Sequence, residues 1–128
     1  MYNSDYYLRR EDNFNDKIND CKVRKDSLQS YIDKLEDIVP KIEAAAEDLS
    51  VASLALEEGV IINGKPYDKG EYKVYSQELK DIKIDFEDIL LKARGNITEL
   101  EQNINNYQDE KDRAHENYLA AWRKENNG

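Results

Sequence analysis

The chain of 128 residues contains little of the side-chain chemistry on which enzymes and metal sites depend. Its single cysteine, Cys21, cannot form an internal disulfide, so a reducing compartment is expected. Its single histidine, His115, cannot build a histidine-based metal cluster or support a Ser-His-Asp or Cys-His arrangement. The five glycines stand singly, which excludes a glycine-rich phosphate loop. We therefore expect no catalysis, no bound metal and no cofactor.

Long apolar runs are missing as well. No run approaches the roughly 18 residues that a membrane span needs. The opening stretch MYNSDYYLRREDNFND lacks the apolar region of a cleavable secretory signal. We expect a cytoplasmic protein without a membrane span, and any export would use a route that reads no such signal.

Positive charge is in deficit, with 19 Lys and Arg against 28 Asp and Glu, a net charge of −9. Nucleic acids and anionic membrane surfaces would repel such a chain, so we expect no nucleic-acid partner. Hydrophobic residues make up 39% of the chain and charged residues 37%, which is too little apolar material for a spherical core. An elongated molecule that buries one narrow stripe fits this composition better.

Apolar residues recur at seven-residue spacing throughout the first half of the chain. One series is unbroken: Tyr7, Phe14, Cys21, Leu28, Leu35, Ile42, Leu49 and Leu56. A second series lies four residues on, with two polar gaps: Glu11, Ile18, Lys25, Ile32, Val39 and Ala46. This alternation of three and four residues puts all of them on one stripe of an α-helix. A long helix with a single apolar stripe is unstable alone and must pair with another helix.

The second half of the chain carries a similar stripe. Its members, with one polar gap at Lys111, are Tyr72, Tyr75, Leu79, Ile82, Phe86, Ile89, Ala93, Ile97, Leu100, Ile104, Tyr107, Ala114, Tyr118 and Ala121. The predicted fold class is all-α, an elongated antiparallel two-helix hairpin with coiled-coil-like packing. We expect one domain over residues 1–128, with helices at 5–58 and 69–125 and a short turn or β-ribbon at 59–68. Pro40 lies in register with the first stripe, which favours a kinked helix over two helices.

The turn region contains recognisable signals. Gly59 can end the first helix in a left-handed conformation. Asn63-Gly64 is the pair that a type I′ turn prefers, so Val60–Ile62 and Lys65–Tyr67 are expected to form very short strands. Asp68–Glu71 has the form of a capping box, which would start the second helix.

Aromatic and branched residues supply the candidates for partner binding. Nine tyrosines, which are enriched in interface hot spots, accompany only two phenylalanines and one tryptophan. Three consecutive branched residues beside the turn cannot all point inward in a strand. They either plug the open end of the helix pair or dock onto a partner. The candidate partner-binding residues are Ile61, Ile62, Tyr67, Tyr72, Tyr75, Leu90, Leu91 and Trp122.

The layout of long helix, short turn and long helix, with the turn sequence INGKPYDKGEY, resembles a bacterial secretion family. It is similar to the YwqH-like accessory proteins encoded beside LXG-domain toxins, among the WXG/ESAT-like helical hairpins of type VII secretion. The resemblance implies a non-enzymatic targeting chaperone that binds the helical domain of an LXG toxin, with a second small helical protein, for export. The turn has no Trp-x-Gly, and no Tyr-x-x-x-Asp/Glu follows the second helix, so an export signal would have to come from the assembled complex.

Two other interpretations stay open. One is a prefoldin-like chaperone subunit, which also joins two long helices through β-hairpin structure. The other is a coiled-coil structural or phage protein, and self-association is an alternative to a different partner in each case. A neighbouring LXG-type toxin gene would support the first interpretation, and a second prefoldin-type gene would support the chaperone subunit.

Overall fold

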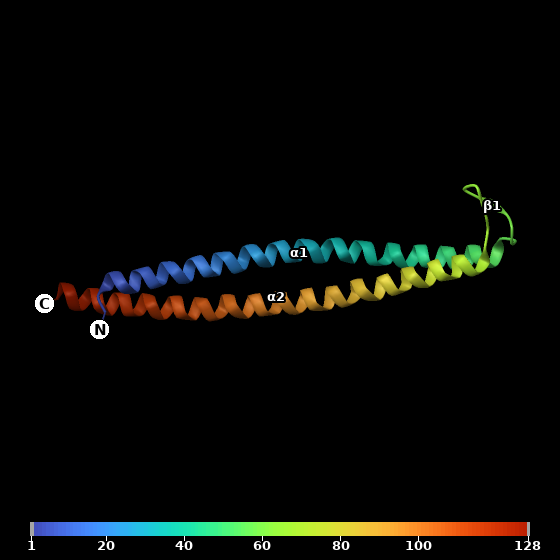
Figure 1. The fold of residues 1–128 in the computed structure, drawn as a ribbon. Helices are drawn as coiled ribbons and strands as arrows, with labels where there is room; N and C mark the ends of the chain where they lie inside the picture. The colour runs from blue at the N-terminus through green and yellow to red at the C-terminus, as the bar shows by residue number, and fades with distance from the viewer. Residues whose placement is uncertain (1, 128) are drawn as a thin grey trace. The chain divides into compact units, whose positions relative to one another are not determined.

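Two long helices make up most of the chain. In the computed structural model, which describes residues 2–127, α1 spans Ser4–Ala55 and α2 spans Lys69–Asn126, with 52 and 58 residues. Two strands of two residues each, β1 (Ile61–Ile62) and β2 (Lys65–Pro66), lie between them. The predicted all-α two-helix hairpin with a short β-ribbon at its turn is confirmed (Figure 1). Within the described residues, neither helix has a stretch long and apolar enough to cross a membrane.

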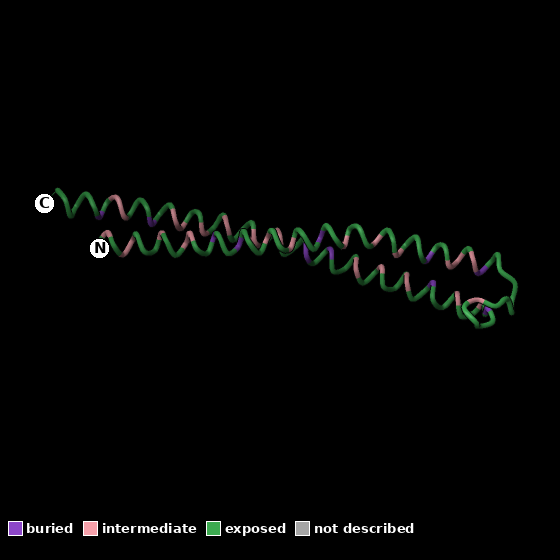
Figure 2. Tube along the Cα trace, turned by 90° about the horizontal axis from the view of Figure 1, so that it is seen from above, coloured by how far each residue is buried: buried purple, intermediate pink, exposed green. Residues whose placement is uncertain are grey.

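The hairpin divides into two compact units, each of which pairs a piece of α1 with a piece of α2 (Figure 1). Unit 1 combines the chain up to Ser30 with the chain from Arg94 onward, and unit 2 is Tyr31–Ala93, which includes the ribbon. In each unit, the buried and half-buried residues follow the sides of the two helices that face each other (Figure 2). We call this line of contact between the helices the seam.

The seam of α1 follows the predicted heptads. Ile18, Ile32 and Ala46 are buried, and the predicted polar gaps Glu11 and Lys25 are half-buried among them. Four- and three-residue steps therefore keep one stripe of α1 against α2 within each unit, as a coiled-coil-like contact requires.

The ends of α1 differ slightly from the prediction. The helix continues through Pro40 as predicted, but it ends at Ala55 rather than at residue 58. Gly59, with φ of 85°, already donates its backbone N–H to the carbonyl of Tyr67 over 3.0 Å. Because this hydrogen bond pairs Gly59 with the strand side of the turn, the chain must leave the helix before residue 59. Leu56, a predicted member of the stripe, is consequently exposed.

Inside unit 2, the seam of α2 includes the predicted members Tyr72, Leu79, Phe86 and Ala93 but is offset by one residue at the other three predicted positions. The predicted members Tyr75, Ile82 and Ile89 are exposed, so this part of the prediction is wrong. Their places in the seam are taken by Ser76, Lys83 and Leu90. Seven-residue steps backward from Ile97, a seam residue, lead to these three positions. The more apolar neighbours consequently lie on a flank of the helix.

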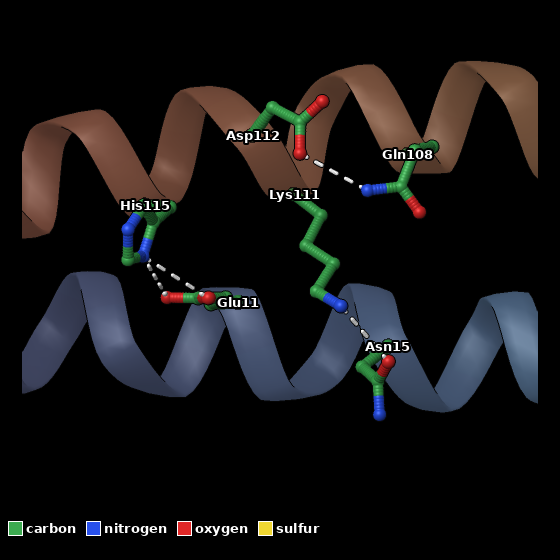
Figure 3. Close-up of polar contacts among 6 residues, drawn as sticks. All are labelled: Glu11, Asn15, Gln108, Lys111, Asp112 and His115. Atoms are coloured by element: carbon green, nitrogen blue, oxygen red, sulfur yellow. Dashed lines mark hydrogen bonds and ion pairs between the residues drawn. The ribbon is translucent and has the colours of Figure 1, made fainter.

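Polar contacts cross the seam of unit 1 (Figure 3). His115 Nδ1 lies 3.3 Å from the carboxylate of Glu11. Lys111 Nζ donates to Asn15 Oδ1 over 3.1 Å. The predicted polar gaps Glu11 and Lys111 are thus accommodated by partners on the opposite helix.

Two further lysines lie in the seam and keep acidic partners. In unit 1, Lys25 Nζ is 3.2 Å from Glu101 Oε1. In unit 2, Lys83 Nζ is 3.4 Å from a carboxylate oxygen of Glu43 and 3.4 Å from one of Glu87. Burial lowers the pKa of Lys83, but hydrogen bonds to the two glutamates outweigh this effect and raise the pKa overall. The ammonium group therefore stays charged within a narrow core.

The ribbon forms as the turn sequence predicts. Asn63 and Gly64 have φ of 50° and 76°, which are the two left-handed conformations of a type I′ turn. The antiparallel register pairs Ile61 with Pro66 and Ile62 with Lys65. One more backbone bond, from Tyr67 N–H to Val60 C=O over 2.7 Å, extends the pairing toward the predicted strand ends.

Asp68 caps the start of α2. Its Oδ1 accepts hydrogen bonds from the backbone N–H groups of Gly70 and Glu71, over 2.9 and 3.3 Å. The predicted cap by Asp68 is confirmed. In a full capping box the side chain of Glu71 would also bond back to the cap residue, whereas here its carboxylate accepts a hydrogen bond from the Tyr75 hydroxyl. That bond holds the Tyr75 ring on the outer side of α2, next to the ribbon.

Candidate protein-binding surface

Large apolar side chains are exposed mainly in unit 2. Among residues 2–127, 17 large apolar side chains are exposed, and 13 of these belong to Tyr31–Ala93. The four in unit 1 are Tyr2, Leu8, Val23 and Trp122. Because scattered apolar residues are normal on any surface, the concentration in one unit is the informative feature.

Many of these side chains gather on one flank of the seam. One set of seam positions in unit 2 comprises Ile32, Val39, Ala46 and Ser53 on α1 and Ser76, Lys83 and Leu90 on α2. The residues that directly precede them are Tyr31, Ile38, Ala45 and Ala52 on α1, and Tyr75, Ile82 and Ile89 on α2. In an antiparallel helix pair, these preceding positions of the two helices meet on the same side. At the equivalent position of α1 in unit 1, Lys17 Nζ lies 5.5 Å from the ring centre of the seam residue Tyr107 on α2, so this side of α1 borders α2. We call the seven preceding residues the apolar flank.

The opposite flank of unit 2 is mixed in character. Glu43 and Glu87 lie there with their ion pairs to Lys83. A shallow groove of about 210 Å³ on that side is lined by Glu43, Lys83 and Ile84 among others. Leu91 occupies the next heptad position after Ile84 and is exposed. Single apolar residues on this side therefore stand among charges.

The apolar flank ends where unit 2 ends. On α1, the equivalent positions in unit 1 are Arg10, Lys17 and Arg24. On α2, the first two equivalents are Asn96 and Asn103. The helices keep their heptads in both units, but only unit 2 adds an apolar strip beside the seam.

A groove extends the apolar flank toward the ribbon. It encloses about 250 Å³, and its lining includes Ile62, Pro66, Tyr72 and Tyr75. The hydrogen bond to Glu71, burial, and the negative charges of Glu71 and Glu78 raise the pKa of Tyr75. Its hydroxyl thus remains protonated at neutral pH, so the rim of the groove presents a neutral aromatic ring.

Tyr67 plugs the ribbon end of the helix pair. It is only 2% exposed, and its ring centre lies 4.9 Å from that of Tyr72. Its hydroxyl is the one buried side-chain polar atom without a hydrogen-bond partner in the described residues. Burial, followed by the nearby charges of Glu58 and Asp68, raises the pKa of Tyr67. Tyr67, a candidate partner-binding residue, is part of the core.

The other predicted partner-binding residues fall into separate places. Ile62, Tyr72 and Tyr75 come together in the ribbon groove, whereas Ile61 points to solvent with 65% of its surface exposed. Leu90 is a buried seam residue, so its expected exposure is wrong. The two remaining candidates, Leu91 and Trp122, are exposed in unit 2 and unit 1, away from the apolar flank.

Sequence reasoning missed the apolar flank as a surface. Tyr31 and Ile38 were not among the candidates, and Ile82 and Ile89 were assigned to the seam. Strict seven-residue steps backward from Ile97 would have separated seam from flank, since they lead to Leu90 and not to Ile89.

Comparisons of the chain with protein-family models, curated proteins and solved structures give no match. The residues 2–127 bring together no group of three or more His, Cys, Asp or Glu side chains that could hold a metal ion. The exposed apolar residues of unit 2 are therefore the feature from which a function can be argued.

Proposed function

We propose that this protein is a non-enzymatic helical partner protein that binds another helical protein through unit 2. The concentration of exposed apolar side chains in unit 2 supports this proposal, since 13 of the 17 in residues 2–127 lie there. Exposed apolar strips at heptad spacing are the surfaces on which amphipathic helices dock. Unit 1, with charged and amide side chains at the equivalent positions, is the polar end of the hairpin.

The apolar flank can supply part of the free energy that specific association needs. Full burial of an isoleucine or tyrosine side chain contributes roughly 1.5–3 kcal/mol, and the large residues of the apolar flank are each about half exposed. Covering Tyr31, Ile38, Tyr75, Ile82 and Ile89 would therefore contribute on the order of 5 kcal/mol, before the entropy lost on association. A partner that also contacts the ribbon groove would add to this.

The resemblance of the turn sequence and layout to YwqH-like proteins favours one class of partner. We propose that the chain binds the helical targeting domain of an LXG-type toxin in the cytoplasm, together with a second small helical protein. The assembled complex would then be exported by a type VII route. The all-α hairpin is compatible with this role.

The alternative of a prefoldin-like subunit is less well supported. Assembly through a shared sheet needs strands of useful length, whereas β1 and β2 have two residues each. A coiled-coil structural protein remains the second candidate, because an exposed heptad flank also suits repeated lateral packing.

The test is co-expression with the helical domain of an LXG toxin encoded beside this chain, with and without the second small helical protein. We expect a stoichiometric complex by size-exclusion chromatography with light scattering, and a higher melting temperature for the complex than for the free chain. Absence of any complex at micromolar concentrations would refute the targeting role.

A further inference from the structure

We propose that the apolar flank of unit 2 is the interface of a homodimer, in which two copies of unit 2 pack face to face with their helices in opposite directions. Two features of the flank point to a second copy as the occupant. One is the arrangement of its large and small side chains, and the other is the order of the charges along its edges. The inference goes beyond the proposed function, because it concerns the chain by itself.

An ion pair across the seam of unit 2 defines which residues of the two helices lie side by side. Lys83 Nζ lies 3.4 Å from a carboxylate oxygen of Glu43. Because the helices are antiparallel, each step backward along α1 from Glu43 is matched by a step forward along α2 from Lys83. To within one residue, the flank therefore contains two shared levels, Ile38 beside Ile89 and Ala45 beside Ile82.

The large and small side chains of the flank fit those of a second copy. A twofold axis that crosses both helices midway between these two levels would place α1 on α1 and α2 on α2, in opposite directions. Ile82 of one copy then meets Ile89 of the other. On α1, large side chains meet alanines, Ile38 on Ala45 and Tyr31 on Ala52. Large residues opposite small ones let facing helices interdigitate, and all four large side chains are at least 40% exposed in the single chain.

Charged residues border the flank, and their sign changes along its length. The bordering heptad positions, all exposed, form three levels when they are aligned by the Lys83–Glu43 pair: Lys34 beside Lys92, Lys41 beside Asp85, and Asp48 beside Glu78. The level farthest from the ribbon is thus basic, the middle level is neutral, and the level nearest the ribbon is acidic.

The proposed axis brings the basic level of each copy onto the acidic level of the other. It passes beside the middle level, so the opposite pairs are Lys34 with Asp48 and Lys92 with Glu78, and each pair occurs twice. Near the axis, Lys41 and Asp85 each face their own counterpart, which gives two like pairs. Opposite pairs therefore outnumber like pairs by four to two.

A twofold axis along the helices would fit these charges poorly. It would place α1 of one copy on α2 of the other at equal levels, so Lys34 would meet Lys92 and Asp48 would meet Glu78. Only Lys41 and Asp85 would then form opposite pairs. The charges consequently specify the direction of the two copies, whereas the apolar side chains supply most of the affinity, since exposed ion pairs are individually weak.

The negative charge of unit 2 lies mostly away from this face. Unit 2 contains 8 basic and 15 acidic residues, a net charge of 8 − 15 = −7. The six bordering residues contribute 3 − 3 = 0 to that total. Glu71, one heptad nearer the ribbon than Glu78, lies beyond the overlap of the two copies of unit 2. At physiological salt, a screening length of about 8 Å limits the repulsion between the remaining charges.

Sedimentation equilibrium of the purified full chain at about 0.15 M salt tests the dimer. We expect a monomer–dimer equilibrium with a Kd between about 10 and 100 µM, because the covered surface is small for a protein dimer. A chain that stays monomeric up to about 1 mM would overturn the inference.

Matched apolar variants locate the interface. Ile82→Ser with Ile89→Ser should weaken the dimer roughly tenfold or more, because each substitution is made in both copies. The control Ile84→Ser with Leu91→Ser removes similar apolar area on the opposite flank and should change the Kd less than about twofold. All four residues are exposed, so circular dichroism is expected to match the wild type. A dimer that survives the first pair of substitutions would refute the face.

A charge variant tests the direction of the two copies. Lys34→Glu would face Asp48 of the second copy and should weaken the dimer roughly fivefold or more, and adding Asp48→Lys should restore it. Lys80→Glu makes the same change of charge beside the groove on the opposite flank and should have the smaller effect. In copies that run in the same direction, Lys34→Glu would instead face Lys92. A tighter dimer of this variant would therefore overturn the proposed arrangement.

Cross-linking tests the position of the axis. With Cys21→Ala to remove the native thiol, Asp85→Cys places one cysteine beside the axis in each copy, so a short bismaleimide should link two chains. The control Asp81→Cys lies about one turn away, outside the bordering positions, and should link poorly. Equal linking of the two variants would refute the axis.

The homodimer covers the surface that the proposed function gives to another helical protein, so such a partner would have to displace the second copy. The two proposals can fail separately. A flank-dependent dimer that binds no toxin domain would leave this inference standing and refute the proposed function. A chain that is monomeric alone but binds the toxin domain would give the reverse result.

Discussion

Leu90 and Leu91 are adjacent leucines for which the structure predicts opposite effects of the same substitution. Leu90 is 6% exposed in the seam, whereas Leu91 is 68% exposed. Replacing a buried leucine by alanine destabilises a protein by about 2–5 kcal/mol, through lost apolar burial and the cavity that remains. The seam of a helix pair is narrow and can relax around a cavity, so we expect a value near the lower limit, about 2 kcal/mol, for Leu90→Ala. For Leu91→Ala we expect a change within about 0.5 kcal/mol.

The pair is well matched because leucine and alanine both favour helix, and the two sites lie in the same part of α2. Urea unfolding followed by circular dichroism at 222 nm measures both free energies of unfolding, provided that each transition is cooperative. Equal destabilisation by the two substitutions, or a larger effect of Leu91→Ala, would refute the seam assignment in unit 2. It would also remove the reason for placing Ile82 and Ile89 on an exposed flank.

Three further predictions concern the ribbon and the helix ends. Tyr67→Phe should unfold at the same or a higher temperature than the wild type, because it removes a buried hydroxyl that has no partner; a clear drop in melting temperature would show that the hydroxyl is bonded. Hydrogen bonds from the side chain and backbone of Ser4 lower the pKa of Glu125, so their stabilisation should be present above the ordinary glutamate pKa of 4.5 and be lost as pH falls through the lowered folded-state pKa. Ser4→Ala removes the side-chain hydrogen bond, so the free energy of unfolding should fall less steeply as pH drops through this range. An unchanged pH dependence would contradict a stabilising role for that bond. Ile61→Ser should leave the melting temperature unchanged, whereas Ile62→Ser, at a half-buried position, should lower it; equal effects would contradict the ribbon orientation.

The sequence was sufficient to predict the hairpin, the ribbon turn and the whole seam of α1 as far as Leu49. Those features depend on local signals, namely heptad spacing, Asn63-Gly64 and the Asp68 cap, which act over a few residues. Three positions of the α2 seam in unit 2 were predicted wrongly, and at two of them Tyr75 and Ile82 are more apolar than Ser76 and Lys83, which lie in the seam. At the third, Ile89 and Leu90 are equally apolar, so hydrophobicity does not separate seam from flank. Selecting the most apolar residue at each turn favours the flank where the true seam contains serine and lysine.

The burial of individual aromatic residues could not be predicted from the sequence. Tyr67 lies beside a turn and a charged aspartate, which suggests exposure, yet the ribbon folds it into the end of the helix pair. That burial accompanies the backbone pairing of Tyr67 with Gly59 and Val60 and its packing against the Tyr72 ring, a combination that no single sequence signal specifies.

The polar contacts in the seam of unit 1 also determine which alternative pairings of the two helices are possible. Sliding one helix past the other by one heptad would move Lys111 from Asn15 to Lys22 or Leu8, and Lys25 from Glu101 to Arg94 or Gln108. In either direction the shift places one ammonium group beside a like charge, Lys111 beside Lys22 or Lys25 beside Arg94. A seam of leucines throughout would tolerate several alignments of nearly equal energy. These charged layers add little stability, but they leave the helices of unit 1 a single alignment.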